Sequence, residues 1–392
     1  MTGSTYSYYP PDVLPRGFRV VRGDNDLLFT EDGAEYIDLL SGSGTVFLGH
    51  ANPAITGRIK EQLDVLWNTG AVPTRLGAEV WAAVEGFLPP SHQLAVLYST
   101  GMEAAEFALR VARHVTGRRG LIGFNGAMHG KSMATARLGW ANPLATLPDF
   151  HCLTYLPEHD EAAILEHVRE TLATATIAAV FLEPLLGSRG GYVPSRAFAE
   201  RLAALCTEQG TLLVVDEIFT GFHRTGPVFL HQDLGVTPDI LLIGKAMGNG
   251  FPVSGVVLDR RYALAGRMLP GSTFAGNPLA ASAVIATLAA MQSQDLPGMV
   301  RAVERTIVAS LSELAASGVA LRGRGALWVV ELPASIPVGA VMARILREGV
   351  VVSTTANFIR LLPPATIRLA HLTRACEVIS RACLERSDQA PA

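Results

Sequence analysis

Residues 240–250 read Ile-Leu-Leu-Ile-Gly-Lys-Ala-Met-Gly-Asn-Gly, an apolar run that ends at Lys245 and is followed by a glycine-rich turn. The only other lysines are Lys60 and Lys131, although Lys and Arg together number 32. The apolar run predicts a buried strand with Lys245 at its carboxyl end. Lysine can lose its proton and attack a carbonyl carbon, whereas arginine stays protonated in proteins. Lys245 is therefore a candidate Schiff-base residue; the alternative is a surface lysine in an ordinary turn.

Short apolar runs of this kind alternate with amphipathic stretches along the first two thirds of the chain. The alternation predicts an α/β fold with a mostly parallel sheet covered by helices on both faces. In such sheets, ligands bind at the carboxyl ends of the strands. The expected strands are Leu94–Tyr98, Gly120–Phe124, Ile177–Leu182, Leu212–Val215, Ile240–Ile243 and Val253–Leu258, and the expected helices include Glu103–His114, Glu161–Ala173 and Ser195–Gln209.

The pattern changes after residue 285, where a long helical stretch, Ala280–Ser317, leads into further helices and a strand pair near Val350–Leu362. This composition predicts a smaller α+β domain, residues 286–392. Residues 46–285 form the large domain. Residues 1–45 are expected to pack with the small domain and to include a hairpin, Leu27–Leu40, around Asp32 and Gly33.

Composition argues against several classes of protein. The net charge is −3, 49% of residues are hydrophobic and no basic block occurs, so we expect neither nucleic-acid nor membrane-surface binding. The four cysteines are scattered, which argues against a disulfide framework and a metal site and favours a reducing compartment. Residues 1–11 have no apolar centre and no run is long enough to span a bilayer. We therefore expect a soluble cytoplasmic protein.

Two more polar groups follow predicted strands. Asp216 ends the Leu212–Val215 strand, where a buried carboxylate needs a cation or several donors; a helix cap or a metal ligand is the alternative. Thr100, Gly101 and Met102 form a turn whose N–H groups could hold a phosphate; an ordinary capped helix is the alternative. Together with Lys245, these groups supply an anion site, a carboxylate and an amine. Pyridoxal 5'-phosphate (PLP) needs all three.

In this order and spacing, the chain resembles the class III aminotransferases of the fold-type I PLP-dependent enzymes. The resemblance spans Gly42 to Leu369 and is most specific over residues 216–226 (DEIFTGFHRTG), 238–240 (PDI) and 244–252 (GKAMGNGFP). It implies a large PLP-binding domain and a homodimer with shared active sites. It also implies transfer of an amino group from an amino-acid donor to a keto acid or aldehyde acceptor, with PLP as the cofactor.

The resemblance also implies roles for individual residues. Lys245 would form the Schiff base with PLP and carry a proton to and from the substrate, and Asp216 would pair with the ring nitrogen. Thr273 would reach the phosphate of the neighbouring subunit's cofactor, and Arg360 would grip a substrate carboxylate. The other implied cofactor contacts are Thr100, Gly101, Met102, Met128, His129 and Glu183.

Several positions depart from the family's pattern. Met128 stands where the family usually stacks an aromatic residue on the cofactor, Met102 where Ser or Thr is frequent, and Phe219 where Gln is common. The loop of residues 185–191 lacks the glutamate that in some members gates the substrate arginine. Lys131 adds positive charge beside His129 and is a candidate substrate contact. These departures favour a specialised biosynthetic acceptor over acetylornithine or GABA.

Two other functions are compatible with the sequence. A glutamate-1-semialdehyde-type aminomutase shares the fold and the lysine, and this chain resembles that group at Gly70–Thr74. The Arg-Leu-Leu-Pro-Pro setting of Arg360 is more similar to the aminotransferases. A PLP-binding protein without transferase activity, such as a scaffold or regulator, is the third possibility, and the intact Lys245, Asp216 and Thr273 argue against it.

Overall fold

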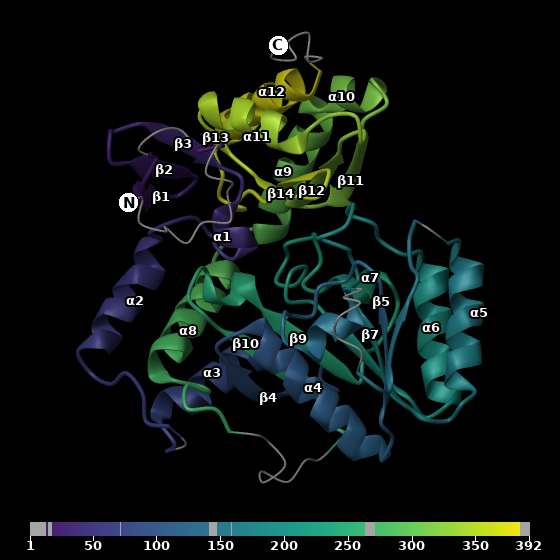
Figure 1. Ribbon diagram of the computed structural model, residues 1–392. Helices are drawn as coiled ribbons and strands as arrows, with labels where there is room; N and C mark the ends of the chain where they lie inside the picture. The colour runs from purple at the N-terminus through teal and green to yellow at the C-terminus, as the bar shows by residue number, and fades with distance from the viewer. Residues whose placement is uncertain are drawn as a thin grey trace, which may run out of the picture.

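A seven-stranded sheet forms the centre of the larger part of the molecule (Figure 1). The computed structural model describes residues 13–14, 18–70, 72–140, 147–157, 159–262 and 271–384. Within the sheet, β10 runs antiparallel to both of its neighbours, and the remaining pairings are parallel. The strands are, in spatial order, β4 (His92–Tyr98), β10 (Ser254–Asp259), β9 (Ile240–Gly244), β8 (Leu212–Asp216), β7 (Ile177–Leu182), β5 (Gly120–Phe124) and β6 (Phe150–Leu153).

Both faces of this sheet are buried because its strands are apolar at successive positions. Leu212 and Val214 of β8 pack in one cluster with α4 (Gly101–Thr116), whereas Leu213 and Val215 pack in the cluster on the opposite face. Continuous apolar strands of this kind are typical of parallel sheets with helices on both sides. The mostly parallel sheet predicted from the sequence is confirmed.

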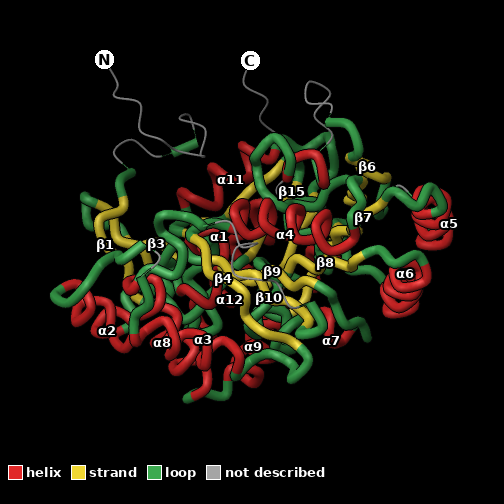
Figure 2. The backbone as a smooth tube through the Cα atoms, turned by 90° about the horizontal axis from the view of Figure 1, so that it is seen from below, coloured by secondary structure: helices red, strands yellow, loops and turns green. Residues whose placement is uncertain are grey.

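Helices surround the large sheet. Figure 2 shows α5 (Glu161–Leu172) and α6 (Arg196–Glu208) side by side near β7 and β8, and the two helices contact each other. No helix among these described segments combines the length and the apolar character that crossing a bilayer would need. The other elements of this part are α2 (Pro53–Leu63), α3 (Arg75–Glu85), the 3-10 turns Thr135–Leu138 and Lys245–Gly248, α7 (Leu230–Asp233) and α8 (Pro278–Gln292).

Two smaller sheets lie in the other part of the molecule (upper part of Figure 1). The first contains β1 (Val20–Asp24), β2 (Leu27–Thr30) and β3 (Glu35–Asp38), and β13 (Val350–Val351) pairs with β3 in parallel. The expected hairpin within Leu27–Leu40 is the β2–β3 pair. The second sheet has the order β11 (Ala320–Arg324), β12 (Leu327–Glu331), β15 (Phe358–Leu361) and β14 (Ser353–Thr355).

The helical stretch expected over Ala280–Ser317 is divided into α8, α9 (Leu296–Ser310) and α10 (Ser312–Ala316). The break between α8 and α9 ends at Asp295, where α9 begins. The Asp295 side chain caps α9 by accepting the N–H of Gly298, and Pro297 stands in the first turn of that helix. The prediction of one continuous helical stretch over Ala280–Ser317 was therefore wrong. Two more helices complete the chain, α11 (Val338–Arg347) and α12 (Leu369–Leu384). A short turn, α1 (Ser41–Gly44), precedes α2 and contains left-handed residues at Gly42 and Ser43.

Candidate active site

Three predicted site residues lie together at the carboxyl edge of the large sheet. Glu183 follows β7, Asp216 ends β8 and Lys245 follows β9, and these three strands are neighbours. All three line one cavity of about 630 Å³. Met128, Lys131 and Arg360 line it too, together with Leu40, Ser43, Trp140, Ser188, Ile218, Phe219, Met342, Ser353, Thr354 and Thr355.

A second cavity of about 590 Å³ adjoins the first, because Met128, Ile218 and Lys245 line both. This second cavity includes Gly101, Met102, His129 and Gly130, the residues of the predicted phosphate turn and of the loop beside it. We call the second cavity the cofactor cavity and the first the substrate cavity.

Lys245 adopts a left-handed backbone conformation, with φ of 44°. Such a conformation costs a side-chain-bearing residue about 1–3 kcal/mol and is found disproportionately at functional sites. Burial lowers the pKa of the Lys245 amine to about 8, against attraction by Glu183 and Asp216 that raises it. A larger fraction of neutral amine is thus present near neutral pH than an exposed lysine would have, as a nucleophilic role requires.

Asp216 is held from two sides. Its Oδ2 lies 2.8 Å from His129 Nδ1, and its Oδ1 accepts the N–H of Ile218 at 3.1 Å. The His129 side chain is buried and packs edge-on against Phe181. His129 therefore orients the Asp216 carboxylate, and Asp216 lines the substrate cavity.

Glu183 is buried beside this pair, and its Oε2 accepts the N–H of Met128 at 2.9 Å. Burial raises the pKa of Glu183 to about 7, and His129 opposes that shift while Asp216 adds to it. The carboxyl group therefore fixes the backbone of the loop that covers the two cavities. It also changes protonation close to neutral pH.

The predicted phosphate turn is the capped start of α4. Thr100 accepts the N–H of Glu103, and Glu103 accepts the N–H groups of Ser99 and Thr100, so the Thr100 hydroxyl is committed to the cap. Gly101 and Met102, the first two helical residues, line the cofactor cavity. The first N–H groups of a helix have no partner within it and attract an anion.

These features fit PLP. The two adjoining cavities together offer helix N–H groups for a phosphate, the Asp216 carboxylate for the ring nitrogen and the Lys245 amine for the aldehyde. Met128 and Ile218 border both cavities and are the side chains available to cover a ring held between them. Gly101 leaves room for Ile218, because a Cβ there would lie 2.8 Å from Ile218 Cδ1. Ile218 was not predicted, since it is an ordinary apolar residue within the 216–226 motif.

The lining of the substrate cavity also combines two cationic side chains with hydroxyl groups. Arg360, on β15, donates to Ser353 Oγ at 2.5 Å. The Lys131 ammonium lies 5.6 Å from the centre of the Trp140 ring. The hydroxyl residues, which sequence analysis missed, are Ser43, Ser188, Ser353, Thr354 and Thr355.

Thr273 lies apart from the other predicted residues and lines neither cavity of its own chain. It is exposed, and its carbonyl accepts the side-chain N–H of Asn68 at 3.0 Å. The neighbouring Ser272 donates to Glu103, in the first turn of α4. The structure therefore puts Thr273 on an exposed loop beside the first turn of α4.

Several residues of the sequence motifs build the site without lining it. Glu217 is fully buried and accepts hydrogen bonds from Thr220 and from the backbone of His231. Asn249 accepts the N–H of Leu48 at 2.7 Å and donates to the Gly49 carbonyl at 3.1 Å. These contacts fasten the turns after β8 and β9 to α7 and to the N-terminal segment.

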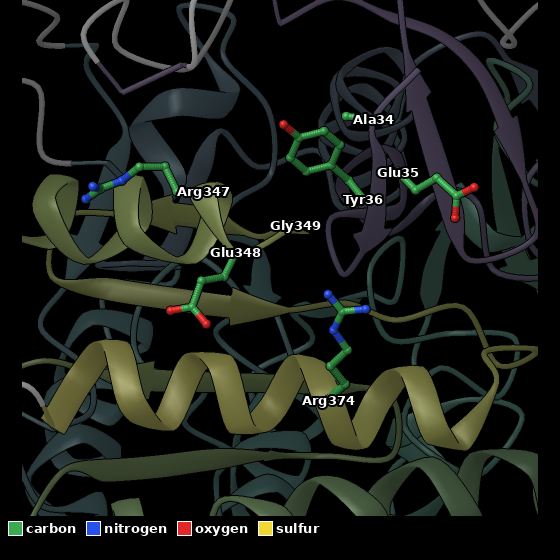
Figure 3. Close-up of a pocket in the computed structure, with 7 residues that line it drawn as sticks. All are labelled: Ala34, Glu35, Tyr36, Arg347, Glu348, Gly349 and Arg374. Atoms are coloured by element: carbon green, nitrogen blue, oxygen red, sulfur yellow. The ribbon is translucent and has the colours of Figure 1, made fainter. Parts of the chain in front are cut away.

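A separate cavity of about 410 Å³ lies away from these residues, between β3 and the helices α11 and α12 (Figure 3). It is shallow and contains none of the predicted site residues. Its lining consists of Ala34, Glu35, Tyr36, Arg347, Glu348, Gly349 and Arg374, and Glu348 pairs with Arg381 on α12. The strand-end cavities therefore remain the candidate active site.

Comparison with known proteins supports the same assignment. The family model described as aminotransferase class-III matches residues 8–383. The chain is 32% identical to a 5-aminovalerate aminotransferase of Pseudomonas aeruginosa, over 94% of this chain and 95% of the relative. It is 33% identical to a 2-aminoadipate transaminase of Pseudomonas putida, over 93% and 95%.

A solved amine transaminase from an uncultivated Pseudomonas species, with PLP bound, superposes with a TM-score of 0.87 at 25% identity over 97% of this chain and 98% of that one. The fold is thus that of the fold-type I PLP-dependent transaminases. These relatives favour an aminotransferase over the aminomutase alternative. The chain belongs to the class III aminotransferases, which use pyridoxal 5'-phosphate.

Proposed function

We propose that this aminotransferase acts on substrates whose carboxylate is bound by Arg360, with Lys245 as the catalytic residue and Asp216 as the partner of the cofactor ring. The observation that carries the proposal is that Lys245, Asp216, Glu183 and Arg360 line one cavity. Bound PLP supplies the electron sink that makes the substrate Cα proton labile. An arginine can hold a carboxylate with two parallel hydrogen bonds, which orients the substrate as well as binding it.

Each side chain then has a defined task. The Lys245 amine would hold the cofactor aldehyde and, as a free amine, would take and return the Cα proton. The Asp216 carboxylate, oriented by His129, keeps the ring nitrogen protonated. The N–H groups of Gly101 and Met102 bind the phosphate, and Thr100 keeps this helix start in place. Met128 and Ile218, which line both cavities, would lie against the ring and exclude water from it.

The substrate class is proposed from the lining of the substrate cavity. Lys131 and Arg360 are both cationic, and the same cavity is lined by several hydroxyl groups. This lining suits an amino acid or keto acid that carries a second anionic or strongly polar group. Of the named activities of the relatives, the one on 2-aminoadipate is in line with this substrate class, because 2-aminoadipate carries a second carboxylate. The departures at Met128, Phe219 and the 185–191 loop favour an acceptor of specialised biosynthesis over acetylornithine or GABA.

Spectroscopy of the purified holoenzyme tests this proposal. Amino donors with and without a second carboxylate are mixed with the enzyme, and conversion of the cofactor to its aminated form is followed by absorbance; carbonyl acceptors are then screened in the reverse direction. Lys245→Ala should bind PLP without covalent attachment and lose turnover. Turnover by Lys245→Ala would contradict the role of Lys245, and efficient use of acetylornithine or GABA would contradict the substrate class.

We also propose a homodimer in which Thr273 contacts the cofactor phosphate of the partner subunit. An exposed apolar patch beside Thr273 supports this: Trp67 is 62% exposed, Val72 65% and Phe274 58%, and the Asn68–Thr273 hydrogen bond joins the two segments. Exposed patches of this kind mark interaction sites. Because each site would take Lys245 from one chain and Thr273 from the other, mixing inactive Lys245→Ala with weakened Thr273→Ala should restore activity. No gain on mixing, with heterodimers demonstrated, would contradict shared sites.

The domain boundaries at residues 45 and 285 and a cytoplasmic location are proposals as well. The parallel pairing of β13 with β3 supports packing of the N-terminal segment with the small domain. All four cysteines are free thiols, which suits a reducing compartment. Cell fractionation of the tagged full-length protein tests the location, and limited proteolysis near residues 45 and 285 tests the boundaries.

A further inference from the structure

Phe219 occupies a particular place in the candidate active site. It lies three residues beyond Asp216, in the turn after β8, and its side chain is buried while still lining the substrate cavity. Lys245 Nζ lies 3.8 Å from the centre of the Phe219 ring, over its face. The face of an aromatic ring is electrically negative, so a protonated amine at this distance is attracted to it.

Two glycines on separate loops hold the ring in this orientation. A Cβ added at Gly187, between β7 and α6, would lie 2.2 Å from Phe219 Cδ1 and Cε1. A Cβ at Gly44, in the α1 turn, would lie 2.7 Å from Cε2, and Gly44 also has a left-handed φ of 82°. Because these atoms lie on opposite edges of the ring, the two backbones grip it edge to edge. One face of the Phe219 ring is therefore directed toward Lys245.

The charges around Lys245 come from several elements. Glu183 after β7 and Asp216 on β8 attract the ammonium form, whereas Arg360 on β15 and Arg224 in the turn after β8 repel it. Both carboxylates are already engaged, Glu183 by the Met128 N–H and Asp216 by His129. Burial is the largest influence on Lys245 and favours its neutral form. The Phe219 ring face adds a direct, close contact that favours the ammonium form.

We propose that Phe219 is a positioning residue: its aromatic face seats the protonated Lys245 amine whenever that amine is not bonded to the cofactor. The proposal rests on the proposed role of Lys245 as the Schiff-base and proton-carrying residue. The Lys245 side chain is a flexible four-carbon stem. A contact that holds its amine limits the positions that the amine can occupy between Schiff-base formation and proton transfer. The glycines at positions 44 and 187 then serve to make room for the seat.

The Lys245 pKa tests the seat without any turnover. In the full-length protein freed of PLP, competitive acetylation followed by mass spectrometry gives the pKa of each lysine. The chain has three lysines, so Lys60, exposed on α2, is an internal reference. Phe219→Leu keeps the site apolar but removes the ring face, and the Lys245 pKa should fall by about one unit, a tenfold change. Phe219→Tyr keeps the face and should leave that pKa unchanged.

Two outcomes would overturn the proposal. If Phe219 were only an apolar wall, Phe219→Leu would leave the Lys245 pKa unchanged, and the smaller polar Phe219→Gln would raise it by admitting water. Gly187→Ala provides an independent variant, because it displaces the ring without removing it; it should lower the Lys245 pKa in the same direction as Phe219→Leu. A wild-type pKa in both Phe219→Leu and Gly187→Ala excludes a seat.

The holoenzyme gives a second measurement. With a donor deuterated at Cα, Phe219→Leu should show a larger kinetic isotope effect and a kcat lower by about tenfold, while KM changes by less than about twofold. Phe198→Leu, which loses a buried ring on α6, controls for a general loss of packing and should not change the isotope effect. An isotope effect that rises equally in Phe198→Leu would contradict a positioning role. Turnover by Lys245→Ala would instead refute the proposed function, so the two failures are distinguishable.

Discussion

At the scale of single residues, the candidate site contains two groups, Glu183 and Lys245, whose pKa values are shifted from their ordinary values. The pKa of Glu183 is raised to about 7 and that of Lys245 is lowered to about 8, and burial is the largest cause of both shifts. Burial disfavours the carboxylate and the ammonium alike, so neither group holds its ordinary charge as firmly as it would in water. Pairs of groups with environments of this kind are typical of sites that move protons.

Glu183→Gln should change how the stability of the PLP-free protein depends on pH. Between 4.5 and about 7, folded Glu183 binds its proton more tightly than unfolded Glu183, so the free energy of unfolding falls as pH rises through this window. The glutamine still accepts the Met128 N–H but does not titrate. Relative to wild type, the variant should gain about 3 kcal/mol on going from below this window to above it. Urea unfolding at several pH values measures this, and parallel curves for the two proteins would contradict it.

At the scale of elements, the sequence predicted the inner strands most closely. The expected bounds of β5 and β7 match the structure, because both strands are apolar throughout and buried on both faces. The edge strand β6 (Phe150–Leu153) was missed, since Phe-His-Cys-Leu is short and only partly buried and lacks a continuous apolar pattern. Sequence pattern therefore predicts a strand well when burial alone determines its composition.

The same distinction holds within the site. Lys245 and Asp216 were predicted because each lies at the end of a strand, and the carboxyl ends of parallel strands meet at one edge. Glu183 was implied by the resemblance to the class III aminotransferases. The hydroxyl residues on β14 and in the α1 turn carry no such signal, because tertiary packing alone brings them to the cavity. The orientation of the Phe219 ring could not be predicted from the sequence either, because it depends on Gly44 and Gly187, which lie far from Phe219 in sequence.

The start of α4 provides a prediction at this scale. Thr100 is the N-cap, and its reciprocal bonds with Glu103 satisfy helix N–H groups next to those that would bind phosphate. Thr100→Ala should lower the free energy of unfolding by about 1 kcal/mol, whereas Thr100→Ser should change it by only a few tenths, about 0.3 kcal/mol. If the cap also positions Gly101 and Met102, Thr100→Ala weakens PLP binding and Thr100→Ser does not. Urea unfolding and a fluorescence titration with PLP measure the two effects; equal values for the two variants would contradict the role of the cap.

At the scale of the whole molecule, Arg224 joins parts of the chain that are distant in sequence. Its guanidinium group is fully buried and donates to the carbonyl groups of Gly44 at 2.9 Å, Pro363 at 2.7 Å and Ala326 at 3.2 Å. It also stacks on the Phe47 ring, 4.2 Å from the ring centre. The pKa of Arg224 is lowered to about 9 by burial. The contacts link the turn after β8 to the α1 turn and to one end of the β12–β15 pair, where β12 begins and β15 ends.

Arg224→Met should therefore loosen the junction between the large sheet and the C-terminal sheet. Removal of the guanidinium leaves three buried carbonyl groups without this donor, at about 1–3 kcal/mol each, and the relief of burying a charge offsets part of that loss. We expect the free energy of unfolding to fall by about 3 kcal/mol. Pro363 follows Arg360 closely, so KM for a carboxylate substrate should rise more than kcat falls.

The control for this loss is Arg169→Met, which removes an exposed arginine that pairs with Glu166 within α5. Surface pairs of this kind contribute about 0–1 kcal/mol, so Arg169→Met should unfold at nearly the wild-type urea concentration. Urea unfolding and substrate kinetics on both variants make the comparison. If Arg224→Met were as stable as Arg169→Met, the buried guanidinium would contribute nothing beyond filling space. A loss of stability with unchanged KM would confine its role to folding and separate it from the placement of Arg360.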